Sequence, residues 1–221
     1  RAFAKEIIFG GTPSLSRQGL GSIATLMLNV AAGAFGDAAI AGMSIVTRIS
    51  FFTYAMVIGL GQGFQPLCGF CYGAKLYGRV KEAFFFCIKC GTVFLSVCAI
   101  LGFIFSTSII SIFRDDAAVV AVGSAALRWQ VLSFPLIASI VLTNMLMQTI
   151  RKPVRANIVA AARSGLFFIP LIFILPYFFG LLGVEMCQMW ADCCSFAVAV
   201  PIAWSAFRDM RREQMELGEK H

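Results

Sequence analysis

Two charged residues lie deep inside long apolar stretches of this 221-residue sequence. Arg48 and Asp192 each lie roughly 12–15 Å into such a stretch, at about 1.5 Å per helical residue. A charge in hydrocarbon costs about 2.5–3.5 kcal/mol on insertion scales, so it usually has a partner or a function. Their similar depths predict an Arg48–Asp192 pair, or two side chains that face one aqueous cavity. The alternative is that each binds backbone carbonyls or another residue.

Asp192 is the carboxylate that lies deepest in any apolar stretch, because Glu185 stands at the outer rim of the same stretch. A carboxylate at this depth is a candidate for binding a coupling proton or sodium ion. A structural acid that is neutralised by an arginine is an equal alternative. No metal site and no cofactor beyond a coupling ion is predicted.

Uncharged polar side chains recur along the apolar stretches and predict a polar interior edged by Phe and Met. Asn144 and Gln148 are four residues apart and therefore share a helix face. Such groups either hydrogen-bond between helices or line a substrate cavity that binds amphipathic molecules through soft contacts. The candidates, together with Arg48 and Asp192, are Gln18, Asn29, Tyr54, Gln62, Asn144, Gln148 and Gln188.

Three further basic residues, Arg17, Lys89 and Arg163, lie within about two turns of one predicted membrane edge. Long basic side chains at this depth reach back to the lipid headgroups. We therefore expect all three to contact headgroups. Arg17 is also the start of a possible polar stripe with Gln18 and Asn29.

The cysteines match a metal-site spacing but lie in the wrong context. The pairs Cys68–Cys71 and Cys87–Cys90 fit a four-thiolate zinc pattern. The second pair lies in an apolar helix, so reduced, small apolar residues are the better interpretation.

The one histidine is His221, which removes Ser–His and Cys–His catalysis and predicts no enzyme. Gly59 and Gly63 form a GxxxG spacing that predicts close helix contact.

The elements that position these residues are long apolar helices. The sequence is 59% hydrophobic and 13% charged, far from the roughly 25% charged of a soluble domain. About 20 apolar residues cross a bilayer, and this predicts an all-α integral membrane bundle of six transmembrane helices. The lobe covers residues 1–207, followed by a charged cytoplasmic tail, 208–221. The predicted spans are Pro13–Phe35, Ala38–Gln65, Ala83–Phe105, Trp129–Ile150, Ile158–Tyr177 and Val184–Phe207.

Basic residues mark one side of the predicted membrane. Twelve of the 18 Lys and Arg residues lie in the first segment, two alternate loops and the tail, whereas Arg114 alone lies in an opposite loop. The positive-inside rule then places both termini in the cytoplasm of a multi-pass cell (plasma) membrane protein. Membrane lipids are expected partners and nucleic acid is not. The chain starts at Arg1 without Met, which indicates a piece of a longer protein.

An ordered series of motifs resembles the multidrug and toxic compound extrusion (MATE) family, in particular its MepA-like branch. The strongest segment is Gly59–Phe84, GLGQGFQPLCGFCYGAKLYGRVKEAF. The other matching features, in order, are Gly11-Thr12-Pro13-Ser14 with Arg17-Gln18, Arg48 in VTRISFF, Gln148 before a basic loop, Arg163 followed by Pro170, and Gly183-Val184 with Ala191-Asp192.

The resemblance implies the C-terminal lobe of a twelve-helix multidrug efflux antiporter, whose N-terminal six-span lobe is missing here. Such proteins export cationic amphipathic drugs in exchange for sodium ions or protons by alternating access. Acids that some members carry in three of these spans are absent, so coupling could lie in the other lobe, supported by Asp192 and Arg48. A lipid-linked oligosaccharide flippase of the same superfamily and, from another class, an intramembrane enzyme are the alternatives.

Overall fold

The structure is a computed structural model that describes the backbone of residues 2–218 and the side chains of residues 18–216. The expectations for the side chains of Gly11–Ser14 and Arg17, and for the last residues of the tail, lie outside the described residues. Throughout the described backbone the regular elements are helices, which confirms the all-α prediction. In chain order they are α1 (Ala2–Gly33), α2 (Asp37–Gly73), α3 (Tyr77–Ile104), α4 (Ser106–Phe113), α5 (Ala117–Thr149), α6 (Pro153–Ala161), the π-helix η1 (Ala162–Leu166), α7 (Phe168–Phe179) and α8 (Leu181–Gly218).

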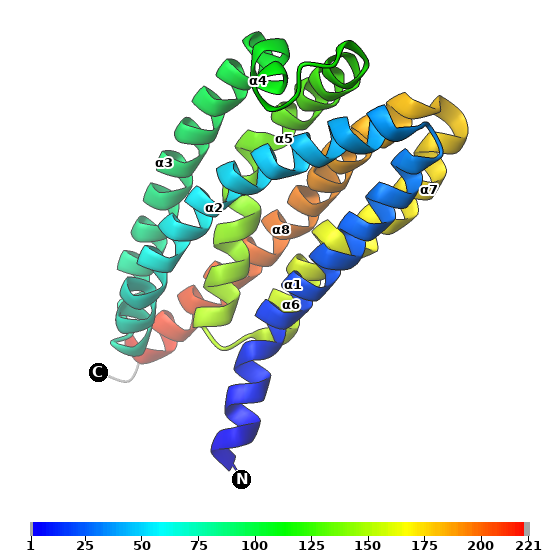
Figure 1. The fold of residues 1–221 in the computed structure, drawn as a ribbon. Coiled ribbons are helices and arrows are strands. Elements are labelled where there is room, and N and C mark those ends of the chain that lie inside the picture. The colour runs from blue at the N-terminus through cyan, green and yellow to red at the C-terminus, as the bar shows by residue number, and fades with distance from the viewer. Residues whose placement is uncertain (1, 219–221) are drawn as a thin grey trace.

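Long apolar helices run side by side and form one bundle (Figure 1). Within the described residues, five helical passes are long and apolar enough to cross a membrane. They are α2, α3, α5, the continuous pass Pro153–Phe179 formed by α6, η1 and α7, and α8 as far as Glu216. Prolines lie inside several helices, including Pro66, Pro135 and Pro201. Each proline removes one backbone hydrogen bond and so favours a bend.

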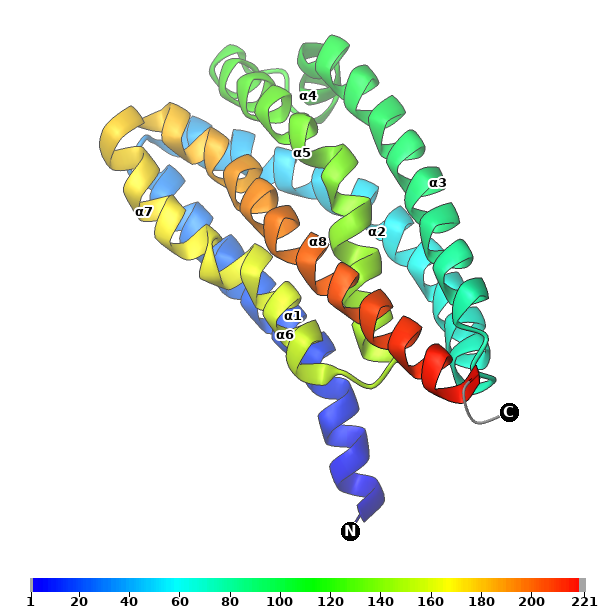
Figure 2. The same ribbon diagram turned by 180° about the vertical axis from the view of Figure 1, so that it is seen from behind.

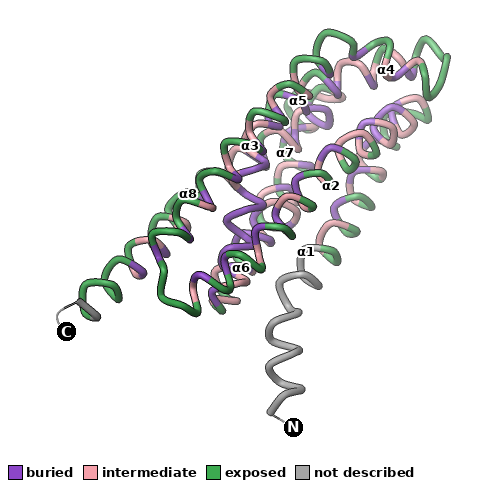
Figure 3. The backbone as a smooth tube through the Cα atoms, turned by 90° about the vertical axis from the view of Figure 1, so that its left-hand side faces the viewer, coloured by how far each residue is buried: buried purple, intermediate pink, exposed green. Residues whose placement is uncertain are grey.

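Helix α5 is the centre of the bundle. In the most apolar 18-residue stretch of α5, 78% of the residues are buried. In the corresponding stretches of α2 and α3, 17% are buried. Helices α2, α3 and α8 all pack against it, and Figures 1 and 2 show it between them from both sides. Buried positions concentrate where the helices face one another, while the outer faces are exposed (Figure 3). The apolar outer faces of α2 and α3 are left for lipid or for a partner to cover.

Glycines allow α2 to approach α5 closely, but not the two that the sequence pattern suggested. A Cβ atom on Gly42 would lie 3.1 Å from the backbone nitrogen of Gly123, and one on Gly61 would overlap the sulfur of Met145. Gly59 and Gly63 have no heavy atom within 4 Å of the Cβ position. The predicted close contact of this pair is therefore wrong in the described structure, because the face of α2 that meets α5 runs through Gly61.

The basic segments gather at one end of the bundle. The loops that join α2 to α3 and α5 to α6, and the end of α8, lie at the lower end of Figure 1. There Asp209 of α8 accepts hydrogen bonds from Lys152 at 2.6 Å and from Arg155 at 3.1 Å. Tyr77 of α3 donates to Glu213 of α8 at 2.7 Å. The end of α8 is thus tied to both neighbouring loops.

Candidate functional site

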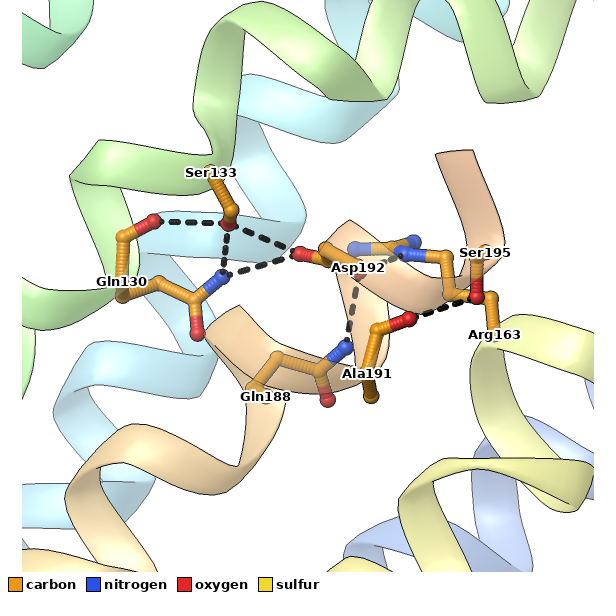
Figure 4. A network of polar contacts seen from close by, with 7 residues as sticks. All are labelled: Gln130, Ser133, Arg163, Gln188, Ala191, Asp192 and Ser195. Atoms are coloured by element: carbon orange, nitrogen blue, oxygen red, sulfur yellow. Dashed lines mark hydrogen bonds and ion pairs between the residues drawn. The ribbon is translucent and has the colours of Figure 1, made fainter. Parts of the chain in front are cut away.

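Asp192 is the centre of a buried polar cluster and lies eleven residues after the start of α8 (Figure 4). Its side chain is fully buried, at 0% exposure. Oδ1 accepts from Arg163 Nε at 2.7 Å and from Gln188 Nε2 at 3.0 Å. Oδ2 accepts from Ser133 Oγ at 2.8 Å and more distantly from Gln130 Nε2 at 3.5 Å. Both carboxylate oxygens therefore have donors, which is the condition for holding a charge inside a protein.

The cluster joins three helical passes. Asp192 and Gln188 come from α8, Gln130 and Ser133 from α5, and Arg163 from η1. Gln130 and Ser133 are three residues apart on α5, so they point to the same side. Sequence reasoning missed both, although their i, i+3 spacing in an apolar helix was an available signal. Figure 4 shows them turned toward Asp192 from the opposite side to Arg163.

Arg163 lies in a π-helical turn, and the local sequence explains part of this irregularity. Pro170 has no N–H to donate to the carbonyl of residue 166, so the regular hydrogen-bond ladder is interrupted just beyond η1. Phe167 N instead bonds to Ala162 O at 3.1 Å, a spacing of five residues. Single π-turns are rare and often found at functional sites.

Tyr54 of α2 extends the cluster toward a third side. The guanidinium carbon of Arg163 lies 4.6 Å from the centroid of the Tyr54 ring. An arginine at this distance from an aromatic face is stabilised by about 0.5–2 kcal/mol, depending on its exposure to water. Arg163 therefore contacts both a carboxylate and an aromatic ring. Its side chain is 17% exposed.

The predicted Arg48–Asp192 pair is wrong, because Arg163 occupies that place and Arg48 is exposed. The two residues do lie at matching depths, since each is eleven residues from the start of its helix at the same end of the bundle. Depth does not decide direction around the helix, and Arg48 points outward. The expectation that Arg163 reaches lipid headgroups is also wrong. Its helix begins at Pro153, five residues before the predicted span, so Arg163 lies deeper than expected.

A second polar cluster ties α5 to α6. Asn144 is buried at 3% exposure and donates to the carbonyl of Ala156 at 2.6 Å. Gln148 donates to Asn144 Oδ1, also at 2.6 Å, so the two share a face as predicted. A cavity of about 20 Å³ lies between the two clusters and is lined by Tyr54, Asn144, Arg163 and Ser164 among others. It has room for a water-sized molecule and not for a drug.

The remaining candidates do not join these clusters. Gln62 lies exposed on α2, Gln18 is exposed on α1, and Asn29 is half-buried on α1. Gln62 and Arg48 therefore belong to the open faces of the lobe. A drug-binding role for these residues stays a prediction that depends on what covers those faces.

Removing the Asn144 side chain is expected to loosen the contact between α5 and α6. In the whole protein, Asn144→Ala should lower the free energy of unfolding by about 0.6–2 kcal/mol, the range for interhelical hydrogen bonds in membranes. Thermal unfolding of the detergent-purified protein measures this. Gln62→Ala is the matched control, because that amide is exposed, and it should change stability by less than about 0.5 kcal/mol. Equal losses in both variants would contradict the assignment.

The cysteines that matched a zinc spacing are all free thiols. Cys68, Cys71 and Cys87 are buried, whereas Cys90 is exposed. Within the described part of the chain, no group of three or more His, Cys, Asp or Glu side chains is placed to hold a metal ion. The thiols act as small apolar packing residues where they are buried.

Known proteins identify the family of this helical lobe. Residues 13–174 match the family model described as MatE, so the chain belongs to the MatE family of multi-pass membrane transporters. It is 27% identical to the multidrug export protein MepA of Staphylococcus saprophyticus over 90% of this chain and 44% of that protein. It is 29% identical to MepA of Staphylococcus aureus with the same coverage.

Solved transporter structures share the fold. The MATE transporter VcmN of Vibrio cholerae in the bent form has a TM-score of 0.87 at 18% identity, covering 94% of this chain and 47% of that one. A MOP superfamily transporter of Pyrococcus furiosus has a TM-score of 0.89 at 18% identity, covering 96% and 48%. The chain thus spans about half the length of the relatives it matches, and it corresponds to one half of a MATE transporter.

Proposed function

We propose that this chain is the C-terminal lobe of a multidrug efflux antiporter that exports cationic amphipathic compounds in exchange for sodium ions or protons. The whole protein would alternate between outward-open and inward-open states. The chain would act with an N-terminal six-helix lobe, in the plasma membrane, with both of its ends in the cytoplasm. Export of this kind involves binding and movement and no covalent chemistry.

The observation that carries the proposal is the Arg163–Asp192 pair, buried inside a lobe of the MatE family. A charge pair in the bilayer interior marks transport or coupling by default, because its insertion is costly. The names of the MepA relatives support multidrug export. The grouping of the basic loops at one end of the bundle supports the orientation.

The geometry also supports a coupling role for the cluster. Alternating access needs an element with two arrangements whose balance an ion can shift. Arg163 lies in a π-turn next to a proline, and its partner Asp192 is a carboxylate that a proton or sodium ion would compete for. Loss of the pair would free η1 to change its hydrogen bonding and so move α7 relative to α8.

The substrate itself would bind on surfaces that the two lobes share. The cavity beside Arg163 is far smaller than the roughly 300–1,000 Å³ of a drug-sized site. The exposed face of α2 carries Phe51, Phe52 and Met56, which suit adaptable contacts with flat lipophilic cations. Exposed Gln62 and Arg48 lie on the same helix.

Transport by the whole protein that carries this chain tests the proposal. Expressed in bacteria without their own multidrug pumps, it should lower the accumulation of ethidium and raise tolerance to lipophilic cations. In proteoliposomes, an imposed sodium gradient or an imposed pH gradient should each be applied alone to identify the coupling ion. Unchanged accumulation, with the protein present in the membrane, would contradict drug export.

A further inference from the structure

Glu185 is a buried carboxylate on α8 that the Asp192 cluster does not use. Its side chain is 4% exposed, and its Oε2 atom has no hydrogen-bond partner among the described residues. A buried carboxylate oxygen without a donor is costly, and native structures rarely retain one without a reason. The residue was expected at the outer rim, but the structure buries it. Its environment therefore calls for a cation that the described residues do not supply.

The position of Glu185 relates it to Asp192. It is the fifth residue of α8, close to the turn that joins α7 to α8. Gln188 and Asp192 follow three and seven residues later, so all three lie along one stripe of the helix. At about 1.5 Å per residue the two carboxylates are separated by about 10 Å along the axis. Gln188 lies between them and donates to Asp192.

The carboxylates of Asp192 and Glu185 differ in their hydrogen-bond and charge partners. Both oxygens of Asp192 accept hydrogen bonds, and Arg163 neutralises its charge. Asp192 therefore has no free oxygen for a cation in this conformation. Glu185 does, because Oε2 is unpartnered.

No described cation from the elements that pack against α8 is bound to Glu185. Arg128 of α5 is exposed, donates to Ser106 and lies over Phe103. Arg163 of η1 is bound to Asp192, and Tyr177 of α7 is 85% exposed.

The other described elements that pack against α8 also provide no charged partner for Glu185. The described side chains of α1, residues 18–33, include no titratable group. Arg155 of α6 binds Asp209 at the opposite end of α8, where Tyr77 of α3 binds Glu213. The remaining charged residues of α3, which are Arg79, Lys81, Glu82 and Lys89, are exposed. On α8 itself, the nearest titratable neighbour is Cys187, whose thiol is directed to the carbonyl of Val184.

We propose that Glu185 is an exchangeable site for a small monovalent cation, a proton or a sodium ion, at the end of α8 nearest the α7–α8 turn. This proposal deepens the proposed antiport function and names the group in this lobe that the coupling ion meets first. The cation neutralises the buried carboxylate, and Gln188 links the site to the Arg163–Asp192 pair. Ion binding at one end of the stripe thereby changes the field at the pair about 10 Å away.

Labelling with a lipophilic carbodiimide tests the site without any transport. The reagent adds the carboxyl O–H across its C=N bond, and the adduct rearranges to a stable N-acylurea, so a labelled peptide gains the mass of one reagent molecule. In the whole protein in membranes, peptide mass spectrometry should find the label on Glu185 and not on Asp192. Labelling should slow as the pH rises. Slowing by added sodium at constant pH would identify sodium as the cation, and no sodium effect would identify the proton.

The controls separate this proposal from a merely buried acid. Glu185→Gln, which keeps the side-chain shape, should lose the label while the protein stays folded. Glu82, which is exposed on α3, reports labelling that does not depend on burial or on sodium. Label on Asp192 in preference to Glu185, no label on Glu185 in a folded protein, or labelling of Glu185 that responds to neither pH nor sodium would each overturn the proposal.

A transport measurement links the site to the proposed function. In proteoliposomes, Glu185→Gln should weaken the response of drug exchange to the imposed ion gradient while drug binding persists. If the wild-type protein moves no drug, the proposed function fails, and the labelling experiment still decides the cation site. If the wild-type protein moves drug and Glu185→Gln responds to the gradient as fully as the wild type, the cation-site proposal fails alone.

Discussion

Replacing Arg163 by Met is expected to lower the yield of folded protein severely. The substitution leaves Asp192 buried at 0% exposure without its charge partner. Breaking a buried ion pair in this way costs about 3–5 kcal/mol, a large part of the stability of a typical protein. Folded yield in membranes and thermal unfolding in detergent measure the loss in the whole protein.

Two further variants identify the cause of this loss. Arg163→Met combined with Asp192→Leu removes both charges and should recover most of the folded yield, because apolar replacements of buried pairs are often neutral. Lys89→Met is the matched control, since it removes a positive charge that is exposed on α3. A single Arg163→Met variant as stable as the Lys89→Met control would show that the pair does not hold the bundle together.

The second large effect is expected at the hairpin between α7 and α8. Gly183→Ala should disrupt this hairpin, because the new Cβ atom would overlap the backbone carbonyl group of Leu175. Backbone cannot move aside as a flexible side chain does, so the cost should exceed the usual 1–3 kcal/mol or so for overpacking. The turn between α7 and α8 cannot lengthen to relieve this overlap, since Gly180 alone separates the two helices and has a φ of 60°. Folded yield of the whole protein measures the effect.

Gly59→Ala provides the comparison for Gly183→Ala. Gly59 is also helical, but nothing lies within 4 Å of its Cβ position. Alanine has the better helix propensity, so this variant should be as stable as the wild type or slightly more stable. If Gly183→Ala unfolds at the same temperature as Gly59→Ala, the close approach of the two helices is not present in the protein.

The fold was predictable because hydrocarbon selects for a simple pattern. Apolar stretches of about 20 residues must form helices when no water is available to bind the backbone, so Val184–Phe207 and the other stretches indicate helices directly. The helices nevertheless extend beyond the predicted spans, as α2 does to Gly73 and α8 to Gly218. Their ends follow from backbone turns and polar contacts at the surface, which hydrophobicity does not encode.

The candidate site was predictable in depth and not in direction. Asp192 was identified because a carboxylate is rare in such a stretch, and Asn144 with Gln148 because their spacing fixes a common face. The partner of Asp192 was assigned wrongly because Arg48 has the right depth but faces outward. Arg163 was assigned to the membrane edge because the pattern of apolar residues reveals neither the π-turn nor the start of the helix at Pro153.

Drug efflux by the charge-free double variant is the most direct test of the account. The whole protein with Arg163→Met and Asp192→Leu should reach the membrane in nearly normal amount, yet should fail to lower ethidium accumulation in cells. That result would assign the buried pair to transport and not to folding alone. Export at the wild-type rate by the folded double variant would contradict the central claim that this pair couples movement of the lobe to an ion.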